Sequence, residues 1–560
     1  MDFVVSCRLR VFAFSLIAVA VCYANSISNP FLQDDLIMVS GNEQIRHVAP
    51  LHFLTSAYAQ DQRLGGLYRP LTILSLSFDY AVWGNQPAGF RITNLFLHIV
   101  NGCLVFALAN MLLGSAAAAW AAAAVYLVHP VHTEAVVGIV GRSELLGALC
   151  FFTAWWLFRK GYTLSSCAAF LMALLSKENA ITFPAVMALD ALCLGGGLRD
   201  LFRQWRRFLA LAGTALAYLG LRLWVIGGLV IPKAIQYAHG SLSSLERIMT
   251  TGRVFLEYFK LVLAPVNVVG VYEFYSIPTA GLRDWVAWTG LILVAAIIVL
   301  GVILARIRPT VGFAILFFFL ALLPVSNWFI PIGAIMGERF LYTPLFGAAL
   351  LAGLLWTNLP TRRVQQVVAA GALITAVCLC VAHNRIWQDD FSFYGNMVRV
   401  FPNNVSGRLG YGYAMLDRGR IPEAIKEFDA AHRILPMTPE FLADVAGAIA
   451  RKDPPHCDQA QPLLNEAFNE EPHHWQSYWM LANCAAAQHR WESADESYRM
   501  ASLYSPSSNA DLLFSWGLTL EALNRKQQAV EAYERALLLK PDDGEIRRRI
   551  ELLERESDAL

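Results

Sequence analysis

WVAWTGLILVAAIIVLGVILA, residues 285–305, is a stretch without a single charged side chain. A helix needs about 20 mostly apolar residues to cross a lipid bilayer. This stretch meets that requirement alone, and it decides the fold class. The chain is expected to be all-α, with a polytopic helical membrane domain.

Ten more apolar runs support this interpretation. They lie near residues 9–27, 92–113, 116–130, 144–160, 162–177, 179–197, 207–227, 310–327, 340–358 and 364–383. The sequence therefore predicts about 11 spans. The first run also fits a cleaved signal peptide, because Arg8 and Arg10 precede a short apolar stretch. We favour an uncleaved anchor, since ten spans follow it.

Composition excludes several classes of protein. Of 560 residues, 56% are hydrophobic and 16% charged, against about 25% charged in soluble domains. The mean hydropathy is +0.45. A soluble single-domain enzyme, a nucleic-acid binder and a disordered scaffold do not fit. The 44 basic and 43 acidic residues nearly balance, yet residues 401–560 alone hold 17 basic and 25 acidic ones. An acidic soluble part therefore follows the membrane part.

Basic residues in the short loops set the orientation, because such residues favour the cytoplasmic side. They are Arg8, Arg10, Arg159, Lys160, Arg199, Arg203, Arg206, Arg207, Arg306, Arg308, Arg362 and Arg363. With eleven spans all of them share one side, which places the C-terminal part outside the cytoplasm. Residues 245–263 are apolar but carry five charged side chains, and we expect an amphipathic helix in the outer interface.

The C-terminal part repeats with a period near 34 residues. Prolines recur at Pro402, Pro436, Pro472, Pro506 and Pro541. A period of 34 is typical of tetratricopeptide (TPR) repeats. Alanines recur twelve and five residues before the closing prolines, and mostly aromatic residues recur eight before them. We therefore expect a membrane domain over 1–390, a linker over 391–402, and a TPR α-solenoid of four repeats plus a capping helix over 403–560.

Two of the ten cysteines lie in the soluble part. Cys457 would begin the second helix of repeat two, and Cys484 would end the first helix of repeat three. These ends are expected to be neighbours, outside the cytoplasm where disulfides persist. A disulfide is one possibility and two free thiols the other, because sequence does not prove connectivity. No CxxC pair or Cys/His cluster suggests zinc.

Two adjacent carboxylates, Asp34 and Asp35, follow the first span. Repulsion and lost solvation beside a membrane both raise a carboxylate's pKa toward a range useful for a general base. The plainer alternative is that they cap the next helix.

The turn between spans three and four contains His129, His132 and Glu134. Two imidazoles and a carboxylate can ligate a metal, but no other cluster completes the site. We favour hydrogen-bonding and phosphate-facing roles and expect no metal in the site. A divalent cation stays possible, and no cofactor is certain.

Further ionisable residues stand at the outer ends of spans. The cations are Arg69, Arg142, Lys177, Arg222 and Arg339, and the acids are Glu144, Glu178 and Glu338. Ionisable groups there are costly, so they indicate a functional site by default. Fixed cations suit a phosphate. An acid pair beside a membrane-held phosphate indicates transfer of a group from a lipid-phosphate donor to an alcohol.

With these motifs in place, the chain resembles the transmembrane and TPR repeat-containing O-mannosyltransferases, of the C-type, polyprenol-dependent glycosyltransferase superfamily. The resemblance rests on Gln33-Asp-Asp35, Tyr68-Arg-Pro-Leu71, His129-Pro-Val-His-Thr-Glu-Ala135, Gly141-Arg142, Ser176-Lys-Glu178, Leu221-Arg-Leu-Trp-Val-Ile-Gly-Gly228 and Glu338-Arg-Phe-Leu-Tyr342. These motifs cover nearly the whole chain in order.

The resemblance implies a polyprenyl-phosphate-linked sugar as donor, typically mannose, and a protein Ser/Thr hydroxyl as acceptor, with inversion in a single displacement. Asp34 and Asp35 would be the catalytic pair, with either one as the base. The donor phosphate would be bound by Arg339, Lys177, Arg142, Arg222 and His132, with support from Arg69, His129, Glu134, Glu178 and Glu338.

Two rival functions stay open. One is a non-catalytic membrane-anchored TPR scaffold, and the other is a glycosyltransferase that acts on a lipid or glycan. The expected partners are the lipid-linked sugar, membrane lipids and an acceptor protein docked on the TPR groove, with no nucleic acid. The location would be a bacterial inner membrane with periplasmic repeats, or an ER membrane with lumenal repeats.

Overall fold

A computed structural model describes residues 2–58, 67–228, 242–272, 275–329, 331–452, 456–505 and 509–558. Pro506 of the predicted proline series lies outside these ranges. The chain divides into two compact units, residues 1–407 and 408–560. The described residues are helices and connections, with no β-strand among them. The all-α fold class is confirmed.

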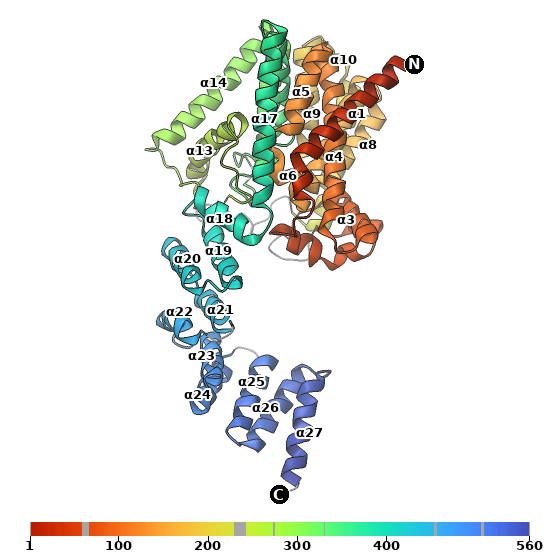
Figure 1. The fold of residues 1–560 in the computed structure, drawn as a ribbon. Helices are drawn as coiled ribbons and strands as arrows, with labels where there is room; N and C mark the ends of the chain where they lie inside the picture. The colour runs from red at the N-terminus through yellow and green to blue at the C-terminus, as the bar shows by residue number, and fades with distance from the viewer. Residues whose placement is uncertain are drawn as a thin grey trace. The chain divides into compact units, whose positions relative to one another are not determined.

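The helices of the first unit are drawn in Figure 1. The α-helices are α1 (Asp2–Tyr23), α2 (Pro50–Thr55), α3 (Pro70–Trp83), α4 (Pro87–Leu113), α5 (Ala116–Val128), α6 (Thr133–Val137), α7 (Arg142–Arg159), α8 (Thr163–Ser176), α9 (Phe183–Leu194), α10 (Leu198–Arg203), α11 (Trp205–Ile226), α13 (Ser244–Leu263), α14 (Trp285–Ile307), α15 (Pro309–Leu322), α16 (Leu345–Thr357), α17 (Arg362–Ile386) and α18 (Asp390–Val400). Short helical turns are η1 (Ala24–Ser26), η2 (Leu36–Ser40), η3 (Glu43–Arg46), η4 (Pro130–His132), η5 (Ile139–Gly141), η6 (Glu178–Thr182), η7 (Leu323–Val325) and η8 (Glu338–Leu341).

A helix occupies each of the eleven predicted spans. Five are long and apolar enough to cross a membrane alone: α1, α4, α11, α14 and α17. The segments Pro130–Val137 and Ile139–Arg159 form a sixth candidate, bent by 99° at its break. The helices α5, α8, α9, α15 and α16 are shorter. Only 17% of the apolar window of α14 and 6% of that of α17 is buried. Such bare apolar helices need lipid around them, so the chain is a multi-pass membrane protein.

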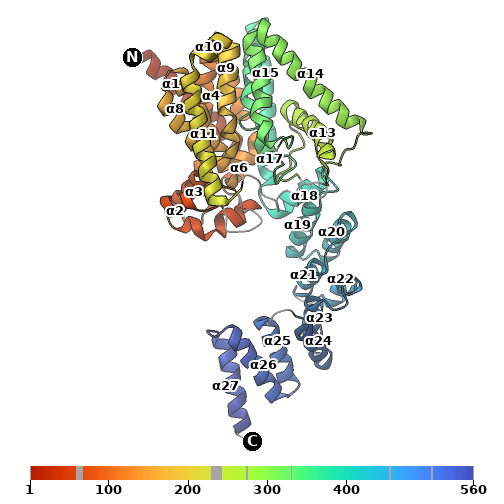
Figure 2. The ribbon, with the colours of Figure 1, turned by 180° about the vertical axis from the view of Figure 1, so that it is seen from behind.

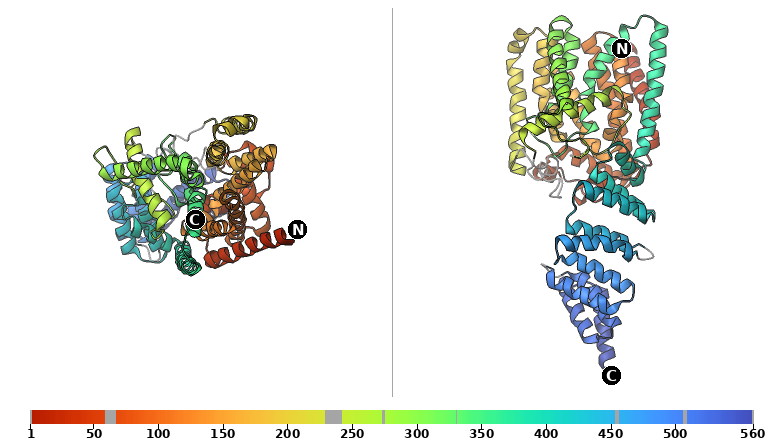
Figure 3. Two further views of the ribbon diagram at one scale, coloured as in Figure 1. Left: turned by 90° about the horizontal axis from the view of Figure 1, so that it is seen from above. Right: turned by 90° about the vertical axis from the view of Figure 1, so that its left-hand side faces the viewer.

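Most long helices of this unit run roughly along one direction (Figure 3). The helix α10, the connection between α14 and α15, and the beginning of α17 lie at one end of the unit (Figures 1 and 2). The helices α2, α3 and α18 lie at the other end. The arginines of α10, of the connection between α14 and α15, and of the beginning of α17 thus lie opposite α2 and α3, on one side as the orientation argument requires.

The predicted amphipathic segment forms α13, which packs against α14 through two glycines. A Cβ on Gly290 would lie 1.9 Å from the Gly252 carbonyl oxygen, and one on Gly252 would lie 2.2 Å from the Ala287 carbonyl oxygen. Small residues allow this approach between membrane helices. Arg253 Nη2 lies 2.6 Å from Asp284 Oδ2, which fixes the beginning of α14.

The second unit is a series of antiparallel helix pairs. Its helices are α19 (Val405–Asp417), in which the division between the units falls, α20 (Ile421–Ile434), α21 (Pro439–Ala450), α22 (Cys457–Glu470), α23 (Trp475–Ala487), α24 (Trp491–Tyr504), α25 (Ala510–Ala522), α26 (Lys526–Leu539) and α27 (Gly544–Asp558). A Cβ on Gly517 would lie 2.4 Å from the ring of Tyr533, so the small residue admits the aromatic one. Cys457 and Cys484 form a disulfide with Cα atoms 5.5 Å apart.

Candidate functional site

The two adjacent aspartates face different surroundings. Gln33 has φ 54°, a left-handed conformation that bends the chain just before them. The side chain of Asp34 is 46% exposed, whereas Asp35 is only 2% exposed. The carboxylate of Asp35 accepts from the N–H of Ile139 at 3.2 Å and of Val140 at 2.9 Å. Asp35 is the N-cap residue of the next helix, η2, but its side chain makes no capping hydrogen bond there, so the capping alternative is wrong for Asp35. Its carboxylate instead binds the beginning of the distant η5.

Burial raises the pKa of Asp35 to about 6, although the two N–H donors and Arg91 oppose the shift. Arg91 is itself fully buried and donates to the carbonyl oxygens of Asn29 and Pro30. Arg91 therefore holds the segment that leads to the aspartates in place. Its positive charge also favours the ionised form of Asp35.

Arg339 connects the aspartates to a distant part of the unit. Its Nη1 lies 2.8 Å from Glu134 Oε1 and 4.0 Å from Asp34 Oδ2. Its backbone N–H also donates to Glu134 Oε2 at 2.7 Å. Glu134 thus aims the guanidinium, which stays 31% exposed beside Asp34. Asp34 and Arg339 form the partly exposed ion pair of the site.

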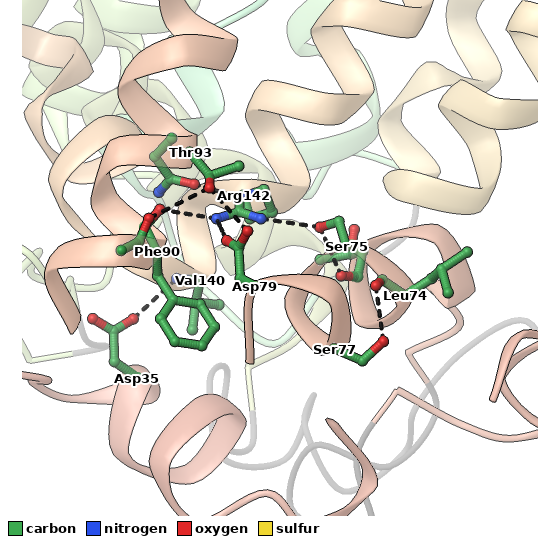
Figure 4. A network of polar contacts seen from close by, with 12 residues as sticks. Asp35, Leu74, Ser75, Ser77, Asp79, Phe90, Thr93, Val140 and Arg142 are labelled. Carbon is green, nitrogen blue, oxygen red and sulfur yellow. Dashed lines mark hydrogen bonds and ion pairs between the residues drawn. The ribbon is translucent and has the colours of Figure 1, made fainter. Parts of the chain in front are cut away.

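Arg142 is buried in a polar network that Figure 4 shows. Its guanidinium lies 2.5 Å from Asp79 Oδ2 and donates to Ser75 Oγ at 3.2 Å and the Phe90 carbonyl oxygen at 2.9 Å. It also donates to Asn94 Oδ1 at 2.5 Å. Arg142 was expected to bind the donor phosphate. Its side chain is 0% exposed and its donors are engaged, so in this structure it supports the turn that Asp35 caps.

Arg69 and Glu178 form a two-point ion pair. Arg69 Nε donates to Glu178 Oε2 at 2.9 Å, and its Nη2 donates to Oε1 at 2.5 Å. Burial alone would raise the pKa of Glu178, but Arg69 outweighs it and lowers that pKa. The guanidinium also lies 5.4 Å from the ring centroid of Tyr58. Both were expected as supporting residues, and the structure pairs them with each other.

Lys177 and Glu144 form a second buried pair. Their Nζ and Oε1 atoms are 2.6 Å apart, and each side chain is only 5% exposed. They line a cavity of about 20 Å³ together with Phe340 and Thr343. That volume suits a single water molecule. Lys177 therefore reaches a phosphate only if its contact with Glu144 loosens.

Three of the remaining expected residues are His129, His132 and Glu338. His129 Nε2 is 3.0 Å from the Val262 carbonyl oxygen. The ring nitrogens of His132 are buried and have no hydrogen-bond partner among the described residues. Glu338 Oε1 accepts from the Val269 N–H at 2.6 Å and the Tyr272 hydroxyl at 2.7 Å.

Arg222 is 7% exposed and lies beside Tyr218 on α11. Burial, followed by Glu134, raises the pKa of Glu338. None of these residues contacts Asp34 directly in the described contacts.

Sequence reasoning missed Tyr58. Its hydroxyl is buried without a partner among the described residues. Burial raises its pKa to about 12, with further influence from the charges of Arg69, Asp34 and Glu178. The neutral Tyr58 hydroxyl can donate a hydrogen bond, and no acceptor among the described residues takes it. Only its position in the first loop, ten residues before Tyr68, could have drawn attention to it.

The geometry can now be compared with known proteins. The family model described as "Tetratricopeptide repeat" matches residues 510–543, which covers α25 and α26. With the apolar helices of the first unit, this match makes the chain a multi-pass membrane protein that carries TPR repeats.

Its curated relatives are named protein O-mannosyl-transferases, and the family resemblance drawn from the motifs is thereby confirmed. The chain is 26% identical to protein O-mannosyl-transferase Tmtc3 of Drosophila melanogaster, over 87% of this chain and 63% of that protein. It is 24% identical to TMTC3 of Mus musculus, over 94% of this chain and 64% of that protein. The chain therefore spans a little less than two thirds of these relatives.

Among solved structures, the chain is similar to ArnT from Cupriavidus metallidurans, a structure bound to undecaprenyl phosphate. The similarity covers 79% of this chain and 80% of ArnT at 13% identity, with a TM-score of 0.38. This likeness is too loose to support a functional conclusion.

Proposed function

We propose that the chain is a membrane glycosyltransferase. It moves a sugar, taken as mannose from the names of the relatives, from a polyprenyl-phosphate donor to Ser/Thr hydroxyls of extracytoplasmic proteins. One observation carries the proposal: the partly exposed carboxylate of Asp34 lies 4.0 Å from the partly exposed guanidinium of Arg339. An acid and a cation at one opening suit a reaction in which a hydroxyl loses a proton and a phosphate gains charge.

The proposed reaction is a single displacement. Asp34 accepts the proton of the acceptor hydroxyl, whose oxygen attacks the anomeric carbon. The bond from that carbon to the phosphate oxygen breaks, and the lipid phosphate leaves with its electrons. The new bond forms opposite the broken one, so the anomeric configuration inverts. Arg339 balances the charge that grows on the phosphate.

The two aspartates divide the work in this proposal. Asp34 is the base, because it is exposed and lies beside Arg339. Asp35 is a positioning residue, because its carboxylate is buried on the N–H groups of Ile139 and Val140. Arg69 is a supporting residue, because Glu178 holds its guanidinium beside the ring of Tyr58. Tyr58 supplies a neutral hydrogen-bond donor.

The disulfide supports an extracytoplasmic location for the repeats. Cys457 and Cys484 are bonded, and such bonds persist in an ER lumen or a periplasm rather than in a cytosol. The repeats would dock the acceptor protein there, as TPR arrays bind partners on a concave surface. A tag at the C-terminus should therefore be reachable only from outside the cytoplasm.

The proposal is tested by incubating the purified chain with a panel of radiolabelled lipid-linked monosaccharides and acceptor peptides. Transfer should occur with the intact chain and disappear with Asp34→Asn, while donor binding persists. A membrane-anchored scaffold would show no transfer to any acceptor. An enzyme acting on lipids or glycans would label those acceptors and leave the peptides unlabelled.

A further inference from the structure

The TPR unit contains a convergence of possible metal ligands far from the aspartates in sequence. Glu440, Glu471 and His474 each offer a ligand atom, and these three atoms lie within 4.8 Å of one another. Both glutamates are exposed, whereas His474 is only 2% exposed. The sequence argument found no zinc pattern, because these residues come from three different helix ends.

The imidazole of His474 supplies an independent sign of a ligand. Its Nδ1 lies 2.8 Å from Ser477 Oγ. Its Nε2 is buried and has no hydrogen-bond partner among the described residues. With the proton on Nδ1 and donated to Ser477, Nε2 carries a lone pair that meets no donor. Metal-binding histidines are oriented in this way, by a hydrogen bond from the ring nitrogen that does not bind the metal.

We propose that Glu440, Glu471 and His474 bind a divalent transition-metal ion, of which Zn²⁺ is the best fit. Imidazole with carboxylates suits Zn²⁺, whereas Ca²⁺ and Mg²⁺ take oxygen ligands only. Ligand atoms on one Zn²⁺ lie roughly 3.4 Å apart. Small rotations of the two exposed glutamate side chains close the remaining distance. Three protein ligands leave the fourth position to water.

The site joins three helix ends. Glu440 lies in the first turn of α21, Glu471 is the C-cap of α22, and His474 is the N-cap of α23. The Cys457–Cys484 disulfide joins the beginning of α22 to the end of α23. The metal and the disulfide would therefore cross-link the antiparallel α22–α23 pair, one at each end.

The helix α22 has a reason to need two cross-links, because it contains Pro462 in its interior. A proline inside a helix removes a backbone hydrogen bond and weakens the helix. The metal would hold this weakened pair against α21 and keep the repeats in register.

The test uses the full chain in detergent, purified without a histidine tag and stripped of metal by a chelator. Zn²⁺ is then titrated in by calorimetry, and the bound metal is counted by mass spectrometry. One Zn²⁺ per chain is expected to bind. Glu440→Gln, Glu471→Gln and His474→Gln should each weaken binding by roughly tenfold or more.

Matched controls are the neighbouring Glu470→Gln and His473→Gln, which should bind like the parent. The two glutamate variants decide the matter alone, because their side chains are exposed and the substitutions do not disturb the core around the buried His474. Hydrogen exchange should slow at the junctions of α21, α22 and α23 when Zn²⁺ is added, and not elsewhere. Equal Zn²⁺ affinity in the parent and both glutamate variants, or no binding by the parent, would overturn the proposal.

Discussion

Asp34 and Arg339 come from opposite ends of the 1–407 unit in sequence, yet Asp34 Oδ2 and Arg339 Nη1 are 4.0 Å apart. Glu134 fixes the guanidinium from behind through a contact of 2.8 Å. The contact makes one exposed surface that can accept a proton and bind an anion. The adjacent Asp35, buried on Val140, belongs to the scaffold beneath it.

Asp35 should make stability depend on pH. Its pKa is raised from 3.8 to about 6 by burial, so the folded state binds its proton more tightly than the unfolded state. The contribution of this group to the free energy of unfolding is therefore fully present below pH 3.8. It falls by roughly 3 kcal/mol as the pH rises through 6. Thermal unfolding at several pH values should show this fall in the parent. Asp35→Asn should flatten it, whereas the surface variant Glu43→Gln should retain it.

Arg142 should tolerate no conservative replacement. Lysine can approach Asp79 but cannot also satisfy Asn94, Ser75 and the Phe90 carbonyl. Arg142→Lys is therefore expected to lower the free energy of unfolding by about 2–4 kcal/mol. Denaturant unfolding in detergent measures the loss. Arg46→Lys, at a surface pair with Glu43, is the control and should change little. Equal stability of the two variants would show that the buried network is dispensable.

The disulfide should stabilise the repeats from within. It closes a separation of 27 residues, for which the loop-entropy estimate is about 3.5 kcal/mol. Cys457→Ser should speed hydrogen exchange in α22 and α23, while Cys378→Ser, at an exposed thiol, should not. Non-reducing peptide mapping of chain taken from cells should recover the linked pair. Recovery of two free thiols would argue against an oxidising location.

The contact between α13 and α14 should be intolerant of added volume. Gly290→Ala places a Cβ 1.9 Å from the Gly252 carbonyl oxygen, and such overpacking costs about 1–3 kcal/mol or more. Gly213→Ala, in a helix with nothing within 4 Å, should be neutral or stabilising by up to about 1 kcal/mol. Thermal unfolding of the two variants compares them. A Gly290→Ala variant as stable as Gly213→Ala would mean that α13 does not pack on α14.

Much of the fold could be predicted, because apolar length and the 34-residue period are local properties of the sequence. The uncharged run at 285–305 became α14, and the small and aromatic positions of the repeats became Gly517 against Tyr533. The sequence named ionisable residues at the ends of the spans but could not give their pairing. Adjacent charges such as Lys177 and Glu178 do not face each other, and their partners, Glu144 and Arg69, are set by packing.

Exposure was the property that the sequence could not supply. Asp34 and Asp35 are chemically identical neighbours, and only the fold buries one of them. In the sequence Arg142 and Arg339 are both cations at the end of a span. In the structure Arg142 is buried by its contacts with Asp79 and Asn94. Asp79 and Asn94 lie inside α3 and α4, where a polar residue is hard to tell from an incidental one.

The proposed division between the two aspartates is tested most directly by measuring sugar transfer from a lipid-linked donor by Asp34→Asn and Asp35→Asn side by side. Folding and donor binding are measured on the same samples. The expected result is that Asp34→Asn folds, binds donor and transfers nothing, while Asp35→Asn keeps turnover in proportion to the folded fraction. Full activity in folded Asp34→Asn would contradict the account.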